Sequence, residues 1–229
     1  KGYLKPAILN FIALLGWHEE KSDKEIYSLE ELIEKFSFAR VQKSGAVFDL
    51  QKFEWINTHY IKELPDDKLI GYLLPYLEKE EFWEKNPNAK ILQRALPDIR
   101  NRLKVLSEIG GLIRVYFSLP AYTADLFPHE KMKVDIEGAK QAIEEGIKIL
   151  ETIPEEEYTI ENLQNKLITL AQNLGWKNGQ LLWPMRCALS GEKFSPGTFE
   201  IASVIGKKET LRRLHESLTM LETHTVKSV

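Results

Sequence analysis

The stretch that most constrains the fold runs from Leu181 to Leu214, where helical segments alternate with clear turn signals. Its first segment, 181–189, is apolar with one arginine, and it ends at Ser190-Gly191, since glycine is favoured just past a helix C-terminus. Ser195-Pro196-Gly197 restarts the chain, with serine as the expected N-cap and proline as the first helical residue. Gly206, followed by two lysines, then breaks this helix and begins another. The pattern predicts three short helices in succession.

The rest of the chain also follows helical periodicity, and no convincing strand is predicted. Ser28 and Glu31 match a capping box, and Asp49 is the expected cap of a further helix. Pro97 and Gly110-Gly111 are expected to divide one long helical stretch. Helices are expected over residues 1–17, 49–64, 66–84, 89–117, 135–151 and 159–174, and a further helix is expected to start at residue 28. The expected fold is therefore mostly α, and its core is expected to include Trp17, Trp55 and Trp83.

Composition excludes several classes of protein. The longest apolar run, residues 8–17, is too short to span a bilayer, and no secretory signal is visible, although a first residue of lysine suggests a piece of a longer protein. The single cysteine, Cys187, excludes an internal disulfide framework and suits a reducing compartment. It is expected to be a small core residue.

Charge is unevenly distributed along the chain. The net charge of −3 argues against bulk attraction to nucleic acid. However, residues 89–114 hold six Lys/Arg against two Asp/Glu, and residues 176–229 hold eight against five, whereas residues 130–161 hold four Lys against ten acids. Such segregation can place a positive surface on one side of an acidic protein. The charge of any single segment is explained equally well by ordinary helix faces exposed to solvent.

No active site is predicted. The five histidines are isolated, with no Cys or carboxylate at metal-ligand spacing. Neither a phosphate-binding loop nor a nucleophile elbow occurs. Gly206-Lys207-Lys208 is similar to part of a phosphate-binding loop, but it lacks the upstream glycine and the preceding strand. We therefore expect no catalytic residue, metal or cofactor in this sequence.

Five motifs carry a family resemblance. They read W-P-M-R-C-A-L-S-G, S-P-G-T-F-E and I-G-K-K-E-T-L-R-R-L near the end, and G-Y-L-x-P-A-I-L-N-F-I-A-L-L-G-W and K-S-G-A-V-F-D-L-x-K-F-x-W-I-N-x-H-Y-I near the start. In the order in which they occur along the chain, they resemble the C-terminal half of bacterial-type glutamyl-tRNA synthetases, and the resemblance covers essentially all 229 residues. The ATP-binding motifs of that family are absent.

The resemblance implies a helical stem-contact fold over 1–62 and an all-helical anticodon-binding domain of two subdomains, over 63–154 and 155–229. It implies recognition of tRNA-Glu, and possibly tRNA-Gln, by a glutamate–tRNA ligase of the cytoplasm, with no DNA or membrane partner. ATP and magnesium would belong to a catalytic domain that this sequence lacks, so the chain alone is expected to be inactive. A monomer is expected.

The resemblance also assigns site residues. It places Trp183, Arg186, Ser195 and Pro196 on the anticodon-contacting surface. The residues themselves fit this role, because Trp183 and Arg186 lie three apart on one helix face and flat side chains stack on RNA bases. Alternatively, Trp183 is a core anchor and Arg186 a carbonyl or carboxylate partner.

Further arginines and lysines are candidates for RNA contacts. Arg100 and Arg102 match an arginine-bearing helix of the same family, but they point about 200° apart, so that one of them could be structural. Six residues are possible contacts to backbone phosphate: Arg94, Lys104, Lys207, Lys208, Arg212 and Arg213. The alternative is that they are plain helix-surface charge.

Two other assignments stay open. One is a free-standing RNA-binding or scaffold module derived from this domain. The other is the helical C-terminal half of a class I lysyl-tRNA synthetase, against which the closing motifs argue.

Overall fold

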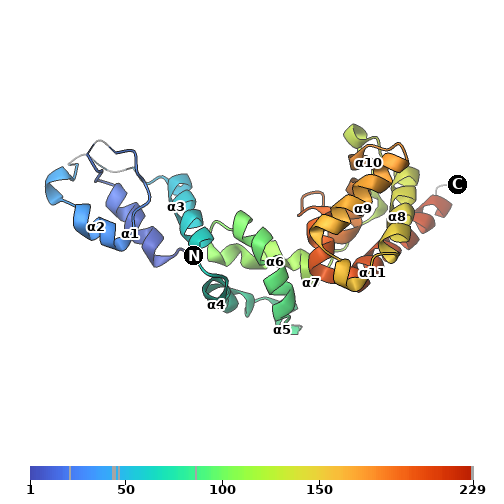
Figure 1. The fold of residues 1–229 in the computed structure, drawn as a ribbon, viewed down its shortest axis with the longest axis horizontal. Coiled ribbons are helices and arrows are strands. Elements are labelled where there is room, and N and C mark those ends of the chain that lie inside the picture. Colours follow the sequence, from blue (N-terminus) through green and yellow to red (C-terminus); the bar gives the residue numbers. More distant parts are fainter. Residues whose placement is uncertain (21, 43–44, 46, 86, 228–229) are drawn as a thin grey trace. The chain divides into compact units, whose positions relative to one another are not determined.

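The structure, a computed structural model, describes residues 1–20, 22–42, 45, 47–85 and 87–227 (Figure 1). These residues form helices joined by turns, and no strand occurs among them apart from one isolated bridge between His129 and Val134. The predicted mostly α fold is confirmed. None of the described helices is both long enough and apolar enough to cross a membrane.

The chain forms two compact units. Unit 1 comprises Lys1–Lys85 and Ile99–Leu112, and unit 2 comprises Asn86–Asp98 and Ile113–Val229. These units are defined by packing and do not follow the three segments 1–62, 63–154 and 155–229. The assignment of a role to each of those segments stays a prediction.

Unit 1 is built from short helices, and two of them begin at side-chain caps. Ser28 and Glu31 form the predicted capping box, and the Asp49 carboxylate accepts a hydrogen bond from the Lys52 backbone N–H (3.0 Å). The helices that lie in this unit are α1 (Lys5–Leu14), α2 (Leu29–Lys35), η1 (Phe38–Arg40), α3 (Leu50–Glu63), α4 (Asp66–Leu77), α5 (Glu81–Lys85) and η2 (Leu106–Glu108). Two more, α6 (Ala89–Arg102) and α7 (Ile109–Phe117), have residues in both units.

Stacked aromatic rings pack α1 against α3, and a buried asparagine ties α1 to the loop before α2. The Phe53 ring stacks on Tyr3 and Phe11, with ring centroids 4.1 Å and 4.6 Å apart. The Asn10 amide is fully buried, where it donates to the Glu25 carbonyl (2.8 Å) and accepts from the Tyr27 N–H (2.6 Å). This satisfied polar group ties the loop before α2 to α1.

The expected division of residues 89–117 is wrong in its position. Helix α6 continues through Pro97, and Gly110-Gly111 lie inside α7. Proline has no backbone N–H, so the carbonyl of Gln93, four residues earlier, lacks its helical donor. Both residues are exposed, so water can replace the missing hydrogen bond. The chain breaks instead around Leu103, which is fully buried.

Two of the three tryptophans expected in the core of unit 1 are buried there. Trp17 and Trp83 are buried, but the Trp55 side chain is 51% exposed, so the prediction for Trp55 is wrong. Its helix, α3, buries Phe53, Ile56, Asn57 and Ile61 instead, and this face leaves Trp55 at the surface.

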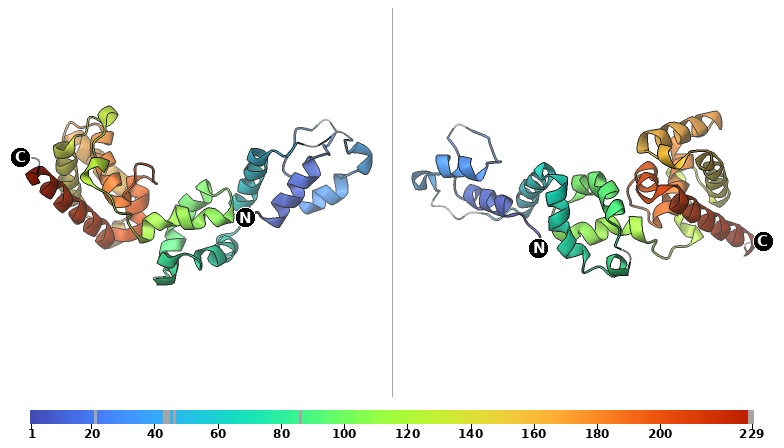
Figure 2. Two further views of the ribbon diagram at one scale, coloured as in Figure 1. Left: turned by 180° about the vertical axis from the view of Figure 1, so that it is seen from behind. Right: turned by 60° about the horizontal axis from the view of Figure 1, so that its bottom comes forward.

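Unit 2 is a bundle of longer helices. Its elements besides parts of α6 and α7 are η3 (Ala124–Leu126), η4 (Glu130–Met132), α8 (Ile136–Glu151), η5 (Glu155–Glu157), α9 (Ile160–Asn173), α10 (Asn178–Ser190) and α11 (Thr198–Lys227). Helices α8, α10 and α11 pack against one another, and α9 packs on all three (Figures 1 and 2). The helices predicted over 135–151 and 159–174 are α8 and α9.

Helix α11 combines the last two of the three predicted short helices. It starts at Thr198, two residues later than Pro196, and Gly197 accepts its first backbone bond from Ile201 (3.0 Å). The predicted N-cap role of Ser195 is therefore wrong. Gly206 interrupts α11 with φ 81° and ψ 171°, a backbone conformation that glycine adopts without steric cost.

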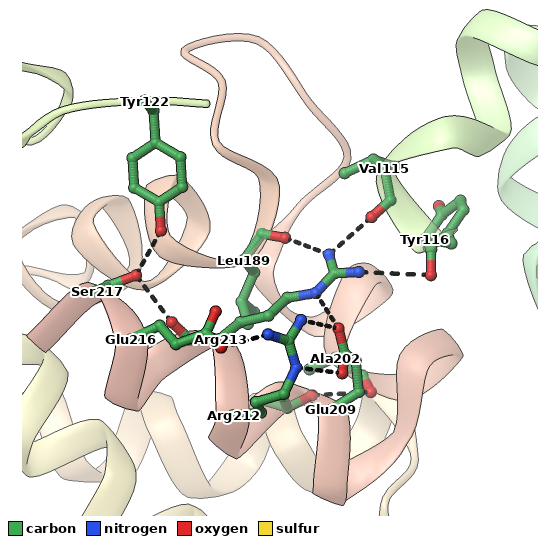
Figure 3. Close-up of polar contacts among 11 residues, drawn as sticks. Val115, Tyr116, Tyr122, Leu189, Ala202, Glu209, Arg212, Arg213, Glu216 and Ser217 are labelled. Carbon is green, nitrogen blue, oxygen red and sulfur yellow. Dashed lines mark hydrogen bonds and ion pairs between the residues drawn. The ribbon is translucent and has the colours of Figure 1, made fainter. Parts of the chain in front are cut away.

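A buried arginine links three helices of unit 2 (Figure 3). The Arg213 side chain, 1% exposed, donates to the carbonyls of Val115 and Leu189 (both 2.7 Å) and Tyr116 (3.5 Å). Its Nε donates to the Glu209 carboxylate (2.8 Å). These acceptors lie near the C-terminal ends of α7 and α10, where backbone carbonyls lack partners within the helix.

Cys187 is expected to be unreactive until unit 2 unfolds. Its thiol is buried, 3.8 Å from the Leu126 carbonyl oxygen, and burial raises its pKa to about 12. Because the thiolate is the reactive form, a disulfide reagent at mildly alkaline pH should label the native protein far more slowly than the urea-unfolded protein. Absorbance of the released thiol measures both rates. Equal rates would contradict the buried position.

Candidate nucleic-acid interface

A pocket of about 330 Å³ opens in unit 2 between α10 and the start of α11. Its walls are largely apolar, with a few polar groups among them. The lining residues are Met132, Gly179, Leu182, Trp183, Arg186, Gly197, Thr198, Phe199 and Glu200. The Thr198 hydroxyl donates to the Leu182 carbonyl (3.0 Å), so the two helices that form the pocket are directly linked. An apolar cleft with a few convergent polar groups is the usual form of a ligand site.

Trp183 is both a core residue and a wall of this pocket. Its side chain is 8% exposed, and its indole N–H donates to the Phe127 carbonyl (2.8 Å). The His129 ring lies edge-on to it, with centroids 4.3 Å apart. The core-anchor alternative therefore describes much of its environment, although one part of the residue still lines the pocket.

Arg186 lies where the i, i+3 spacing predicts, beside Trp183. Its guanidinium carbon is 4.8 Å from the indole centroid, a cation–π arrangement, and its Nη2 donates to the Lys193 carbonyl (3.0 Å). The guanidinium therefore lies over the indole, and both residues line the pocket.

Two buried polar atoms of the pocket residues lack hydrogen-bond partners among the described residues. They are the Nε donor of Arg186 and the Oε2 acceptor of Glu200. A buried polar group without a partner costs free energy, so native proteins rarely retain one without a reason. Both residues line the pocket, so a shift of either side chain would bring its unpaired atom to a ligand there.

The Ser195-Pro196-Gly197 turn reaches this site through its glycine. A Cβ at Gly197 would lie 2.2 Å from the Glu200 Oε2 atom, so the glycine leaves the space that this carboxylate occupies. Pro196 is buried, and the Ser195 hydroxyl donates to the Pro196 carbonyl (3.0 Å). Of these three residues, the pocket lining includes Gly197 alone. The anticodon roles of Ser195 and Pro196 stay predictions.

Arg100 and Arg102 lie in unit 1 and differ in their surroundings. The Arg100 Nη1 donates to the carbonyls of Ile61 (3.0 Å) and Leu64 (2.6 Å), and its Nη2 pairs with Asp66 at 2.5 Å. It thereby caps the C-terminal end of α3, which favours a structural role for Arg100. Arg102 is exposed and lines another pocket, together with Lys104.

The possible phosphate contacts divide into three groups. Arg213 is fully buried, so its prediction as a phosphate contact is wrong. The Lys207 ammonium donates to the carbonyls of Glu151 (2.8 Å) and Ile153 (2.7 Å) at the end of α8, and Arg212 pairs with Glu209 and Glu216. Arg94, Lys104 and Lys208 are exposed and stay candidates.

Several residues of the pocket have no role predicted from the sequence. They are Met132, Thr198, Phe199 and Glu200. The S-P-G-T-F-E motif contained the signal for three of them. Met132 comes from η4, distant in sequence, and no local pattern indicates its place over Gly179. Among the described residues, no group of three His, Cys, Asp or Glu is placed to hold a metal ion.

The helical fold agrees with comparison to known proteins. The family described as "Anticodon binding domain" matches residues 68–218. The chain belongs to this anticodon-binding domain family. The match includes α10, the start of α11 and all nine residues that line the pocket.

Relatives of known function extend the match to nearly the whole chain. A glutamate–tRNA ligase of Clostridium novyi is 39% identical over 223 residues, which are 97% of this chain and 45% of that protein. One from Clostridium botulinum is 40% identical over 97% of this chain and 44% of its own length. The chain therefore spans a little under half the length of these relatives.

Solved structures share the fold. A glutamate–tRNA ligase from Elizabethkingia meningosepticum, solved in complex with its amino acid, superposes with a TM-score of 0.78 at 24% identity. The superposition covers 96% of this chain and 42% of that one. A glutamate–tRNA synthetase from Elizabethkingia anophelis gives a TM-score of 0.74, also at 24% identity, over 95% of this chain and 41% of that one.

Proposed function

We propose that this chain recognises the anticodon loop of tRNA-Glu as part of a cytoplasmic glutamate–tRNA ligase. Membership of the anticodon-binding domain family and the likeness to glutamate–tRNA ligases support the proposal. In such an enzyme, ATP, magnesium and glutamate would bind outside this region, so that the chain itself supplies tRNA binding. Whether tRNA-Gln is also accepted would depend on the bases that the pocket admits.

The observation that carries the proposal is the pair of buried polar atoms at the unit 2 pocket. The edge of an RNA base offers hydrogen-bond donors beside acceptors, and single-stranded bases are read through these edges and by stacking. The Arg186 Nε–H can donate to a base acceptor, and the Glu200 Oε2 can accept from an amino or imino group. Apolar walls from Leu182 and Phe199 would cover the faces of the base.

Two variants that keep side-chain size test this role. Glu200→Gln replaces an acceptor-only oxygen by an amide, and Arg186→Lys removes the Nε donor and the planar fork. Each should weaken binding of the tRNA-Glu anticodon stem–loop by about 1–2 kcal/mol, roughly 5- to 30-fold in Kd. A stem–loop with altered anticodon bases should be affected less. Fluorescence anisotropy of labelled stem–loops measures both affinities.

Glu192→Gln serves as the matched control, since it makes the same change of charge at an exposed residue outside the pocket. It should leave the ratio of the two affinities unchanged. Equal affinity of wild type and both pocket variants for every loop would exclude the pocket as the anticodon site. A chain that binds no tRNA at low salt would refute the proposal altogether.

A further inference from the structure

Met132 lines the unit 2 pocket without being buried. Its side chain is 39% exposed, although it lines the pocket together with Leu182 and Phe199. A methionine that only filled a gap in the core would be enclosed, as Met185 of α10 is. The exposed thioether therefore offers an apolar surface that a ligand in the pocket can cover.

The turn that carries Met132, residues 129–134, is closed by its own backbone. Two hydrogen bonds join His129 and Val134, from the His129 N–H to the Val134 carbonyl (2.8 Å) and in the reverse direction (3.2 Å). The Met132 N–H donates to the His129 Nδ1 atom (3.3 Å). Lys133 adopts the left-handed conformation, φ 54° and ψ 49°, which few residues other than glycine adopt. A turn fixed in this way lowers the cost of ordering Met132 when a ligand binds.

Two side chains of this turn contact α10 one helical turn apart. The His129 ring lies edge-on to Trp183, and the Met132 sulfur lies over Gly179, four residues earlier in the same helix. A Cβ at Gly179 would collide with that sulfur, so the glycine leaves the space that the thioether occupies. Glycine weakens a helix compared with alanine, so its presence in α10 fits a need for this space. The turn and α10 together set the place of Met132.

The wall that Met132 adds to the pocket is apolar and adaptable. A thioether packs favourably against aromatic rings, and an RNA base is a ring of this kind. The groups proposed to read the edge of the base, Arg186 and Glu200, come from α10 and α11, so Met132 adds contact area and limits the space. Anticodons for glutamate contain pyrimidines alone, the smaller bases. A wall that narrows the pocket therefore favours them over purines.

We infer that Met132 is a specificity-determining residue of this pocket, where its thioether, held over Gly179, contacts the bound base and restricts the pocket to a pyrimidine. The inference rests on the proposed function, because it names a residue that selects among bases at the same site. It also assigns a role to a segment outside α10 and the S-P-G-T-F-E motif. Leucine would keep the apolar wall at a similar size, whereas alanine would remove it.

Stem–loop binding to variants of the complete 229-residue chain tests the selection. The probes are the labelled tRNA-Glu anticodon stem–loop and three loops that each carry a purine in place of one anticodon pyrimidine. Met132→Ala should lower the preference for the cognate loop over one of the purine loops by at least about threefold, whereas Met132→Leu should keep it. Met220→Ala, the same change at a half-buried methionine outside the pocket, is the control and should bind as the wild type does.

Gly179→Ala displaces the thioether without removing it, because the new Cβ takes the space of the sulfur. This variant should lower the same preference. In a chain that already carries Met132→Ala the added Cβ meets no sulfur, so the double variant should lose no more than Met132→Ala alone. Additive losses would contradict an effect that passes through Met132.

Methyl NMR tests the contact without any comparison of affinities. The chain holds three methionines, and the signal that Met132→Ala removes belongs to Met132. In the chain labelled with methyl-¹³C methionine, the cognate stem–loop should shift this signal, because an aromatic base lies against the methyl group. The signal of Met185, which is fully buried and outside the lining, should shift less.

The outcomes separate this inference from the proposed function. A Met132→Ala chain that keeps the full preference, or a Met132 methyl signal that a bound loop leaves unmoved, would overturn the inference even if the Arg186 and Glu200 variants lose anticodon binding. A wild-type chain without any preference for the cognate loop would instead refute the proposed function, and the selection by Met132 with it. Circular dichroism of each variant checks that the fold is kept.

Discussion

Arg213→Met is expected to lower the free energy of unfolding by about 3–5 kcal/mol, because it leaves buried acceptors without their donor. The carbonyls of Val115 and Leu189 each accept from this guanidinium at 2.7 Å inside the core of unit 2. Methionine keeps the apolar part of the side chain but lacks the guanidinium, so the loss combines the unsatisfied polar groups with the space that the guanidinium leaves. Urea unfolding followed by far-ultraviolet circular dichroism measures the change.

Arg212→Met is the matched control, since it makes the same substitution one residue earlier at a side chain that is 50% exposed. Its surface pairs with Glu209 and Glu216 should contribute no more than about 1 kcal/mol. If both variants lose the same stability, the buried network would not be the cause. If Arg213→Met unfolds as the wild type does, the network would contribute nothing to stability.

The same network makes unit 2 sensitive to acid. Burial alone would raise the pKa of Glu209, but hydrogen bonds from Arg212 and Arg213 more than offset it, so its pKa lies below the ordinary value. A carboxyl with a lowered folded pKa stabilises the protein above its unfolded pKa, and this contribution is lost as pH falls through the folded pKa. Arg213→Met removes one of the two donors, so the stability of this variant should depend less on pH in the acid range.

Trp183→Ala is expected to lower the free energy of unfolding by about 3–5 kcal/mol, because it opens a cavity in the core of unit 2. The substitution also leaves the Phe127 carbonyl without its donor. Trp183→Phe fills most of the space and loses mainly that hydrogen bond, so it should cost about 1–2 kcal/mol. Urea unfolding of the two variants measures the difference.

Trp55→Ala provides the control for this prediction, because it makes the same chemical change at a half-exposed tryptophan and should cost far less stability. A Trp183→Ala protein as stable as the wild type would contradict its place in the core. If the expected loss is observed, weakened RNA binding by Trp183→Ala cannot be assigned to a lost contact. The variants of Arg186 and Glu200 then carry the test of the anticodon pocket.

The sequence predicted most helices because their signals are local. The capping box at Ser28, the Asp49 cap and the glycine breaks at Gly191 and Gly206 each act within one turn of backbone. Where a local signal failed, tertiary packing decided. Pro97 would end an isolated helix, but α6 continues past it because its buried face lies elsewhere on the helix.

The candidate sites could be predicted only in part. The spacing of Trp183 and Arg186 predicted that they would be neighbours, and the Arg186 guanidinium does lie over the Trp183 ring. Amphipathic spacing could not separate Trp55 from Trp17 and Trp83, because it marks a face of a helix without saying which neighbour covers it. Nor could it indicate that Glu200 would hold a buried oxygen, since this depends on the turn at Gly197 and on α10 across the pocket.

The break at Gly206 has a consequence for how unit 2 can vary. Each added residue turns a helix by about 100°, so the angular phase of the segment after Gly206 is set by the six residues between it and Arg213. Arg212 and Arg213 are adjacent, yet one faces water and the other the core. Deletion of one residue in this interval would move Arg213 to the exposed position of Arg212 and put Leu214 among the carbonyls of Val115 and Leu189. The segment should therefore accept changes of residue type far more readily than changes of length.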